Sequence, residues 1–406
     1  MSAGPSARRP GLPDVGPVVP FAPQLDDDDI ADLRLRLDRA RWPEEATEPG
    51  DAQGLALDVL QELVRYWRED YDWSRLRARL ASVPQVRVEV DGLGVHALHV
   101  RSPRPDAVPL LLAHGWPSTC FEFLGLVPLL TEPARGPAFH VVAPSLPGYG
   151  WSDRPAGPGW GIERTADAWA ALMSALGHER FVAHGGDWGA VVGTALARRH
   201  PDRVAGLHLT MPVSAATEED RLGASASEQR GLAREAAYRR TGYGYAQIQR
   251  TRPQTIGYAL VDSPVALCAW LAEKLVAWSG RGPDGTPLLS TDAVLDVVSI
   301  YWLTATGASA ARLYREVDWR AQTAPVDVPT GCSIFPDEII RPPRSAVARQ
   351  HRRLVQWREL GRGGHFPAAE VPEVLAEELQ AFVGSLTVLG DLSINGQSNS
   401  CEGADR

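Results

Sequence analysis

The stretch Phe181-Val-Ala-His-Gly-Gly-Asp-Trp-Gly-Ala190 contains a short apolar strand, a tight turn and the start of a helix. Gly185 and Gly189 flank Asp187, two residues away on either side. A sharp strand-to-helix turn needs such small residues because it is crowded, and it presents its central side chain at the edge of a sheet. That position usually holds a serine nucleophile, and here it holds a carboxylate. On its own, the pattern is equally typical of a glycine-rich turn whose aspartate only caps the next helix and takes no part in chemistry.

A second motif, His114-Gly-Trp-Pro117, follows the apolar segment Leu110 to Ala113. In proteins with such a turn, the loop at this place supplies backbone N–H groups that bind a developing oxyanion. We therefore expect the amides of Trp116 and Trp188 to be the two donors. The Trp116–Pro117 bond is expected to be cis, which would define the shape of the loop. Contacts with a small-molecule substrate are expected from His114, Gly115 and Pro117.

A third motif, Arg362-Gly-Gly-His365-Phe366, follows the last expected strand. A histidine behind two glycines at this edge would lie beside the turn at Asp187, which favours a catalytic role over a structural one. The acid that orients it should follow the preceding strand, where Phe335-Pro-Asp337-Glu338 offers two carboxylates. Glu338 is preferred, and Asp337 is the alternative.

Around these motifs, apolar strands alternate with helical segments, which is typical of the α/β class. The expected architecture is a mostly parallel sheet with helices on both faces, preceded by a β-hairpin within 86–100. Beyond Pro212 the pattern becomes helical and rich in aromatic residues, which indicates a cap over the carboxyl edge of the sheet, where ligands bind. The expected core segments are strands at 110–113, 141–143, 181–183, 330–334 and 354–357, and helices at 166–176 and 371–383.

These patterns divide the chain into five parts. Residues 1–20 are rich in proline and glycine and are expected to form a flexible arm, and 390–406 a polar, disordered tail. Residues 21–85 form an N-terminal extension with two amphipathic helices, the first of which begins at the acidic run 26–29. The α/β core comprises 86–212 and 325–385, with the helical cap at 213–324 between them.

The composition argues against several classes of function. Asp plus Glu number 50 and Lys plus Arg 41, and this net charge of -9 disfavours nucleic acid or an anionic membrane as the main partner. Lys274 is the only lysine, which disfavours a Schiff-base mechanism. The four cysteines form no CxxC pair or metal-ligand cluster, which argues against structural zinc and a disulfide framework. With no recognisable signal peptide or membrane-spanning run, a cytoplasmic protein without cofactor or metal is expected.

From roughly Val19 to Val383, the chain resembles the epoxide hydrolases of the microsomal and juvenile-hormone type. The shared motifs agree in order, spacing and context, and the N-terminal segment resembles the extension that wraps the hydrolase domain of that family. The membrane anchor is missing, so the resemblance implies a soluble bacterial member with the α/β-hydrolase fold. The matching segments are HGWP at 114–117, GGDWG at 185–189, GGHF at 363–366, Arg41-Trp42-Pro43 and Tyr71-Asp72-Trp73.

The resemblance also implies two cap tyrosines that act on the epoxide oxygen. The segment Gly244-Tyr245, ahead of Pro253, resembles the first, with Tyr243 as the alternative. The segment Arg312-Leu-Tyr314 resembles the second. Further substrate contacts are expected from Tyr301 and Trp302.

The reaction implied is hydrolysis of an epoxide to a vicinal diol. A carboxylate such as Asp187 can displace at saturated carbon and leaves an ester that water can cleave. Tyr245 and Tyr314 would assist ring opening, because tyrosine with a pKa of about 10 stays protonated at neutral pH. His365, oriented by Glu338, would then activate the water that cleaves the ester.

Two alternatives stay open on the sequence alone. A haloalkane dehalogenase shares an aspartate nucleophile and tryptophan N–H donors, but a halide leaving group does not need the cap tyrosines. A non-catalytic ligand-binding protein on the same fold usually lacks a triad member, whereas Asp187, Glu338 and His365 are all present here. A homodimer is compatible with the sequence, which determines neither the oligomeric state nor the identity of the substrate.

Overall fold

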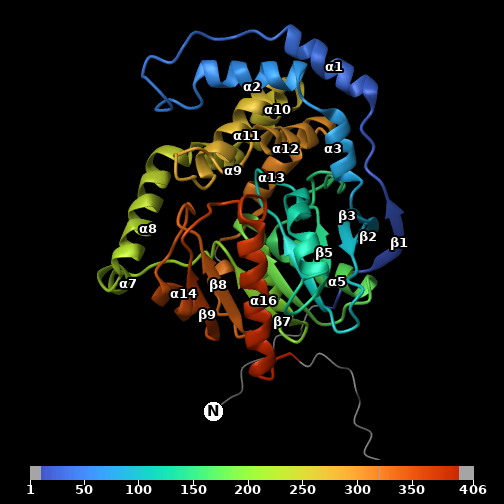
Figure 1. Cartoon of the computed structure of the whole chain (residues 1–406), viewed down its shortest axis with the longest axis vertical. Helices are drawn as coiled ribbons and strands as arrows, with labels where there is room; N and C mark the ends of the chain where they lie inside the picture. The colour runs from blue at the N-terminus through green and yellow to red at the C-terminus, as the bar shows by residue number, and fades with distance from the viewer. Residues whose placement is uncertain (1–10, 320, 393–406) are drawn as a thin grey trace, which may run out of the picture.

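The computed structural model describes residues 11–319 and 321–392 (Figure 1). In this part of the chain, one sheet contains β1 Val15–Phe21, β2 Gln85–Val90, β3 Leu93–Val100, β4 Val108–Ala113, β5 Phe139–Pro144, β6 Phe181–Gly185, β7 Val204–Leu209, β8 Thr330–Ile334 and β9 Leu354–Glu359. The strand order is β1-β2-β3-β5-β4-β6-β7-β8-β9. Pairing is antiparallel from β1 to β5 and parallel from β5 to β9, as the alternating pattern predicts.

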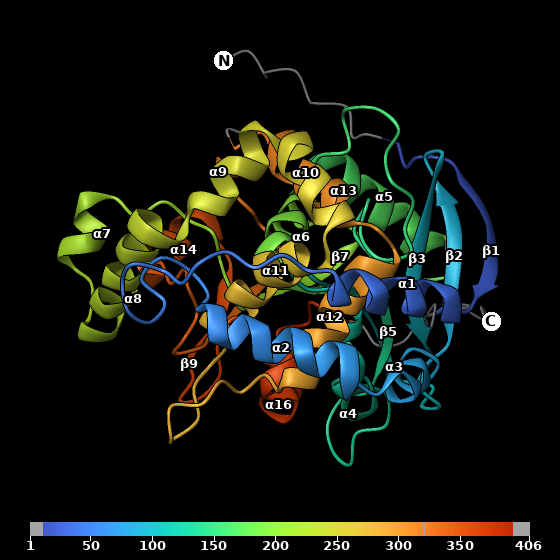
Figure 2. The ribbon, with the colours of Figure 1, turned by 90° about the horizontal axis from the view of Figure 1, so that it is seen from above.

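Helices cover both faces of this sheet. Figure 2 shows α5 (Ile162–Ala175) and α6 (Asp187–Arg199) on one side, and α4 (Val127–Thr131) and α16 (Pro372–Val388) on the other. Central strands such as β6 are buried at every residue because neither face is exposed to solvent. The shorter core helices are η1 Cys120–Gly125, η3 Ala321–Thr323, α14 Arg344–Gln350 and α15 Pro367–Glu370.

The strands and the β-hairpin expected from the sequence are confirmed, and β8 has the predicted bounds. The pattern does not reveal β7, whose segment Val-Ala-Gly-Leu-His-Leu is buried at every residue. Glycine and, to a lesser degree, alanine are depleted in strands, and this one is stabilised by pairing with β6 and β8.

The expectation of a flexible arm over residues 1–20 is wrong for residues 15–20, which form part of a strand. Strand β1 begins at Val15 and pairs antiparallel with β2 at one edge of the sheet. Pro17 and Pro20 are compatible with this position, because an edge strand leaves one side without a partner for backbone N–H groups. Residues 1–10, and 393–406 of the expected tail, lie outside the described part of the chain.

The N-terminal extension continues with α1 (Asp27–Asp38), α2 (Leu57–Glu69) and α3 (Trp73–Leu80). Asp26 caps α1 by accepting a hydrogen bond from the Asp28 amide at 2.9 Å, as the acidic run predicts. In Figure 1, α1 and α2 lie across the cap helices. The indole Nε1–H of Trp67 donates to Ser299 Oγ at 2.9 Å, so this extension is anchored to the cap by a buried hydrogen bond.

The cap is helical, as expected from its aromatic-rich pattern. It contains α7 Glu218–Leu222, α8 Ala226–Ala237, the π-helical turn η2 Tyr238–Gly242, α9 Gly244–Thr251, α10 Pro253–Asp262, α11 Pro264–Trp278, α12 Thr291–Leu303 and α13 Gly307–Glu316. Within the described residues, no single helix is long and apolar enough to cross a membrane. The sharply bent pairs α10–α11 and α12–α13 each reach that length and composition only together.

Candidate active site

Asp187 lies at the junction of β6 and α6 with a positive φ of 46°. A Cβ at Gly189 would lie 1.9 Å from the carbonyl oxygen of Ala113, and one at Gly185 would lie 2.3 Å from the backbone of Gly189. Both flanking positions therefore require glycine. The carboxylate projects toward the other two motifs rather than capping α6, so the turn presents it for chemistry.

The amide of Trp116 donates to Asp187 Oδ1 at 2.9 Å. A Cβ at Gly115 would lie 2.3 Å from the same oxygen, so glycine is needed for this close approach. The Trp116–Pro117 bond is cis, as expected. Trp188, the second expected donor, lies in the first turn of α6, where backbone N–H groups lack partners within the helix.

His365 connects Asp187 with an acid. Its Nδ1–H donates to Glu338 Oε1 at 2.8 Å, and its Nε2 lies 3.5 Å from Asp187 Oδ2. Asp337 instead accepts hydrogen bonds from Arg234 and from the Arg281 amide, each at 3.1 Å. Of the two candidate carboxylates, it is therefore Glu338 that orients the imidazole.

The imidazole of His365 is buried between two carboxylates. Burial lowers the pKa of His365, but the charges of Glu338 and Asp187 outweigh it and hold the pKa well above its ordinary value. A change in the charge of Asp187 would therefore change the proton affinity of His365.

The two predicted cap tyrosines lie together above Asp187. The ring of Tyr245 stacks on Trp116 with centroids 4.7 Å apart, and Tyr314 packs edge-on against Trp188, also at 4.7 Å. Burial is the main cause that raises the pKa of both hydroxyls well above the ordinary value, so both stay protonated at neutral pH. Tyr243, the alternative, packs at the side of Tyr245, with centroids 6.3 Å apart.

Asp187 lies between two cavities of different character. The larger, of about 390 Å³, contains Tyr245 and Tyr314 and has mostly aromatic and aliphatic walls. The smaller, of about 20 Å³, contains His365 and has room for about one water molecule. An apolar molecule and a water can thus reach the carboxylate from different sides.

Four residues that are expected to bind substrate do not line the two cavities at Asp187. His114 donates from Nδ1 to the Gly115 carbonyl and accepts from the Leu146 amide, so its ring supports the loop. Tyr301 donates to the Ser118 carbonyl at 3.1 Å and is fully buried. Both side chains are thus used within the fold, and neither lines the cavities at Asp187. Pro117 and Trp302 likewise do not line either cavity at Asp187.

Two further polar side chains at the site escape recognition from the sequence. Tyr238 lines the large cavity, and its hydroxyl is 2.9 Å from that of Tyr245. Glu122 lines the small cavity, where burial raises its pKa to about 7 despite a hydrogen bond from Ser118. The spacing of HGWP to Glu122 could have pointed to the latter, since η1 starts only three residues after Pro117.

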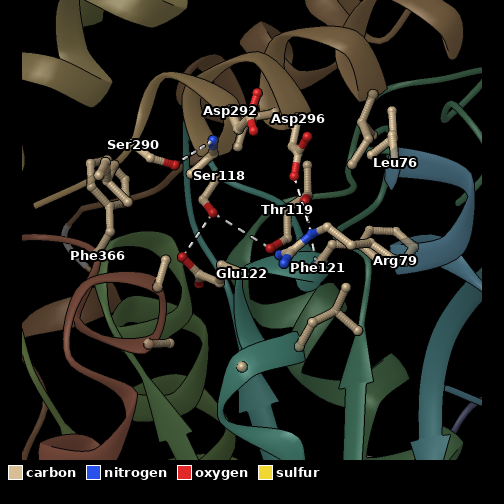
Figure 3. Close-up of a pocket in the computed structure, with 18 of the residues that line it drawn as sticks. Leu76, Arg79, Ser118, Thr119, Phe121, Glu122, Ser290, Asp292, Asp296 and Phe366 are labelled. Carbon is tan, nitrogen blue, oxygen red and sulfur yellow. Dashed lines mark hydrogen bonds and ion pairs between the residues drawn. The ribbon is translucent and has the colours of Figure 1, made fainter. Parts of the chain in front are cut away.

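Glu122 also borders a third cavity, whose walls carry both charged and apolar side chains. This cavity has a volume of about 320 Å³ and lies between the extension, η1 and α12. Figure 3 shows Arg79, Asp292 and Asp296 in its walls. Ser118 and Glu122 line both this cavity and the small one. In the described residues, no three His, Cys, Asp or Glu side chains come together as a metal site.

Several known proteins that match this chain, and one family profile, are named epoxide hydrolases. The family profile "Epoxide hydrolase N terminus" matches residues 18–123, and "alpha/beta hydrolase fold" matches 108–240. A Stigmatella aurantiaca protein named "Putative epoxide hydrolase" is 46% identical over 369 residues, which are 89% of this chain and 84% of that protein.

Two solved structures of epoxide hydrolases have a similar fold. Juvenile hormone epoxide hydrolase from Bombyx mori is 28% identical with a TM-score of 0.86, covering 93% of this chain and 96% of its own. The epoxide hydrolase of Aspergillus niger is 33% identical with a TM-score of 0.82, covering 94% and 99%. On its motifs, fold and relatives, this chain belongs to the epoxide hydrolase family and has the α/β-hydrolase fold.

Proposed function

We propose that the protein converts an epoxide to a vicinal diol through a covalent ester on Asp187. The observation that carries this proposal is the position of the carboxylate, which lies beneath two protonated phenols on one side and beside His365 on the other. In the first step an Asp187 oxygen bonds to a ring carbon while the carbon–oxygen bond of the epoxide breaks. The alkoxide oxygen takes a proton from Tyr245 or Tyr314.

In the second step, water in the small cavity gives a proton to His365 Nε2 while its oxygen attacks the carbonyl carbon of Asp187. The oxyanion formed on Asp187 is stabilised by the amides of Trp116 and Trp188, each worth on the order of 3 kcal/mol. When the ester bond breaks, the proton on His365 passes to the departing diol oxygen. The proton left on the Asp187 carboxyl returns the site to its starting protonation state, so the cycle consumes only water.

Ester formation would itself activate His365 as a base. Asp187 loses its charge when it is alkylated, and that charge is one of the causes that raise the pKa of His365. The pKa of His365 should therefore fall after the first step. The proton that it held passes to the tyrosinate left by ring opening, which frees Nε2 to accept a proton from water.

Oxygen labelling distinguishes this scheme from direct attack of water on the ring. In a single turnover in ¹⁸O-water with excess enzyme, an ester on Asp187 predicts an unlabelled diol and ¹⁸O in the peptide that contains Asp187. Labelled diol from the first turnover would refute the covalent scheme. His365→Gln should retain the ester as an adduct mass on that same peptide.

The substrate expected for this site is an epoxide with an apolar or aromatic body. The walls of the large cavity support this, since they include Met211, Val213, Trp319, Ile339 and Ile340. A panel of aryl and alkyl epoxides with chiral analysis of the diols would test it. Turnover restricted to small, charged epoxides would contradict it.

A further inference from the structure

The two cap tyrosines have different surroundings, although both lie above Asp187. Tyr245 has two phenol partners: Tyr238, with 2.9 Å between the hydroxyl oxygens, and Tyr314, with which it also shares a hydrogen bond. Tyr238 is the first residue of η2, which is one π-helical turn long. The helix α9, which carries Tyr245, follows η2. Single π turns frequently occur at functional sites, since they alter the direction of side chains within a helical segment.

A buried lysine beside Tyr245 also distinguishes the surroundings of the two tyrosines. Lys274, the only lysine of the chain, is 6% exposed on α11, and its Nζ lies 5.0 Å from the centroid of the Tyr245 ring. Glu273 accepts a hydrogen bond from this Nζ at 2.6 Å and partly balances its charge. A buried ammonium so close to an aromatic ring stabilises electron density on that ring, and a phenolate carries more of it than a phenol.

On the basis of the proposed function, we propose that Tyr245 is the group that gives its proton to the epoxide oxygen, with Tyr238 and Lys274 as its positioning residues. Either hydroxyl can be the donor in this hydrogen bond. When the Tyr245 proton turns toward an epoxide oxygen in the cavity, the O–H of Tyr238 becomes the donor to the Tyr245 oxygen. As that proton moves to the epoxide oxygen, the same hydrogen bond and the charge of Lys274 stabilise the phenolate. Tyr314 then contributes a hydrogen bond without losing its proton.

The test measures ester formation on its own. In a His365→Gln background the ester accumulates, so its rate of formation can be followed by quenched-flow mass spectrometry. Tyr238→Phe should slow this rate about tenfold, as expected for one hydrogen bond to a group that becomes charged. Tyr258→Phe is the control, because it removes a hydroxyl from an exposed position on the cap helix α10, outside both cavities at Asp187, and it should change the rate less than about twofold.

A double-mutant cycle separates this role from a structural one. In a Tyr245→Phe background, the additional change Tyr238→Phe should have no further effect, because the phenol it assists is absent. An equal loss in both backgrounds, or no loss in either, would overturn the proposal. Lys274→Met should slow the same step several-fold and Lys274→Arg should restore it; equal rates for Met and wild type would remove Lys274 from the proposal.

The outcomes also separate this inference from the proposed function. If no adduct forms on Asp187 in the His365→Gln protein, the covalent mechanism itself is wrong. If the adduct forms and Tyr245→Phe slows it, but Tyr238→Phe does not, the mechanism stands and the role of Tyr238 is refuted. Thermal unfolding of each variant shows whether the cap is still folded.

Discussion

The two oxygens of Asp187 have different partners, an amide on Oδ1 and the imidazole of His365 on Oδ2. This division suits a carboxylate that must first attack and then be attacked. The amide holds one oxygen in place and later stabilises the oxyanion, while the imidazole controls the proton on the side of the small cavity.

At this scale we expect Asp187→Asn to lower the pKa of His365. The carboxylate charge raises that pKa, and asparagine removes the charge while keeping the shape, so the imidazole should release its proton at a lower pH. Nitrogen-15 NMR of the imidazole across a pH titration measures this. Asp337→Asn is the control, because Asp337 binds Arg234 and the Arg281 amide instead, and an unchanged pKa in Asp187→Asn would contradict the expected coupling.

The neighbouring carboxylates Asp337 and Glu338 should differ sharply in function. Glu338→Gln should slow ester hydrolysis by at least about 100-fold, since the imidazole loses the charge that orients it and stabilises its protonated form. Asp337→Asn should hydrolyse the ester within about twofold of the wild-type rate. Single-turnover measurements of diol release decide between them, and the reverse order would show that Asp337 is the acid.

At the scale of the element, the turn between β6 and α6 depends on the absence of side chains. We expect Gly189→Ala to destabilise the protein by about 1–3 kcal/mol and to displace Asp187, because its Cβ would lie 1.9 Å from the Ala113 carbonyl. Gly384→Ala in α16 is the control. It has no heavy atom within 4 Å of its added Cβ, so alanine should stabilise the helix by about 0.5–1 kcal/mol. Urea unfolding and the rate of ester formation report both effects, and equal stability of the two variants would show that the turn relaxes.

For the whole molecule, the N-terminal extension and the cap act as one unit because buried polar contacts join them. Asp296 on α12 accepts a hydrogen bond from Tyr71 at 2.6 Å and pairs with Arg75 and Arg79 from α3. The side chain of Asp296 is only 11% exposed. Its removal would leave the charges of Arg75 and Arg79 without their anion in a place that water reaches poorly.

Asp296→Ala should therefore lower the free energy of unfolding by about 3 kcal/mol. Asp262 supplies the comparison, since it also lies on the cap and pairs with Arg36 of the extension, at 3.6 Å, but is 88% exposed. Asp262→Ala should cost less than about 1 kcal/mol. Chemical denaturation of the two variants measures the difference, and similar losses would mean that the extension is held chiefly by its apolar contacts.

The sequence alone determined the features that depend on local chemistry. The alternation of strands and helices, the glycines around Asp187 and the order of the three motifs follow from backbone sterics and short-range hydrophobic pattern, and the structure agrees with them. The hairpin and β8 were predictable for the same reason.

Other features depend on residues distant in the chain and were decided only by the tertiary structure. Strand β7 forms because β6 and β8 lie beside it, and β1 forms because β2 offers its edge. Glu338 rather than Asp337 faces His365 because α8 and the chain after α11 bind Asp337. No local pattern shows that Tyr301 is bonded to Ser118 or that Lys274 lies near Tyr245, because such contacts exist only after packing brings separate elements together.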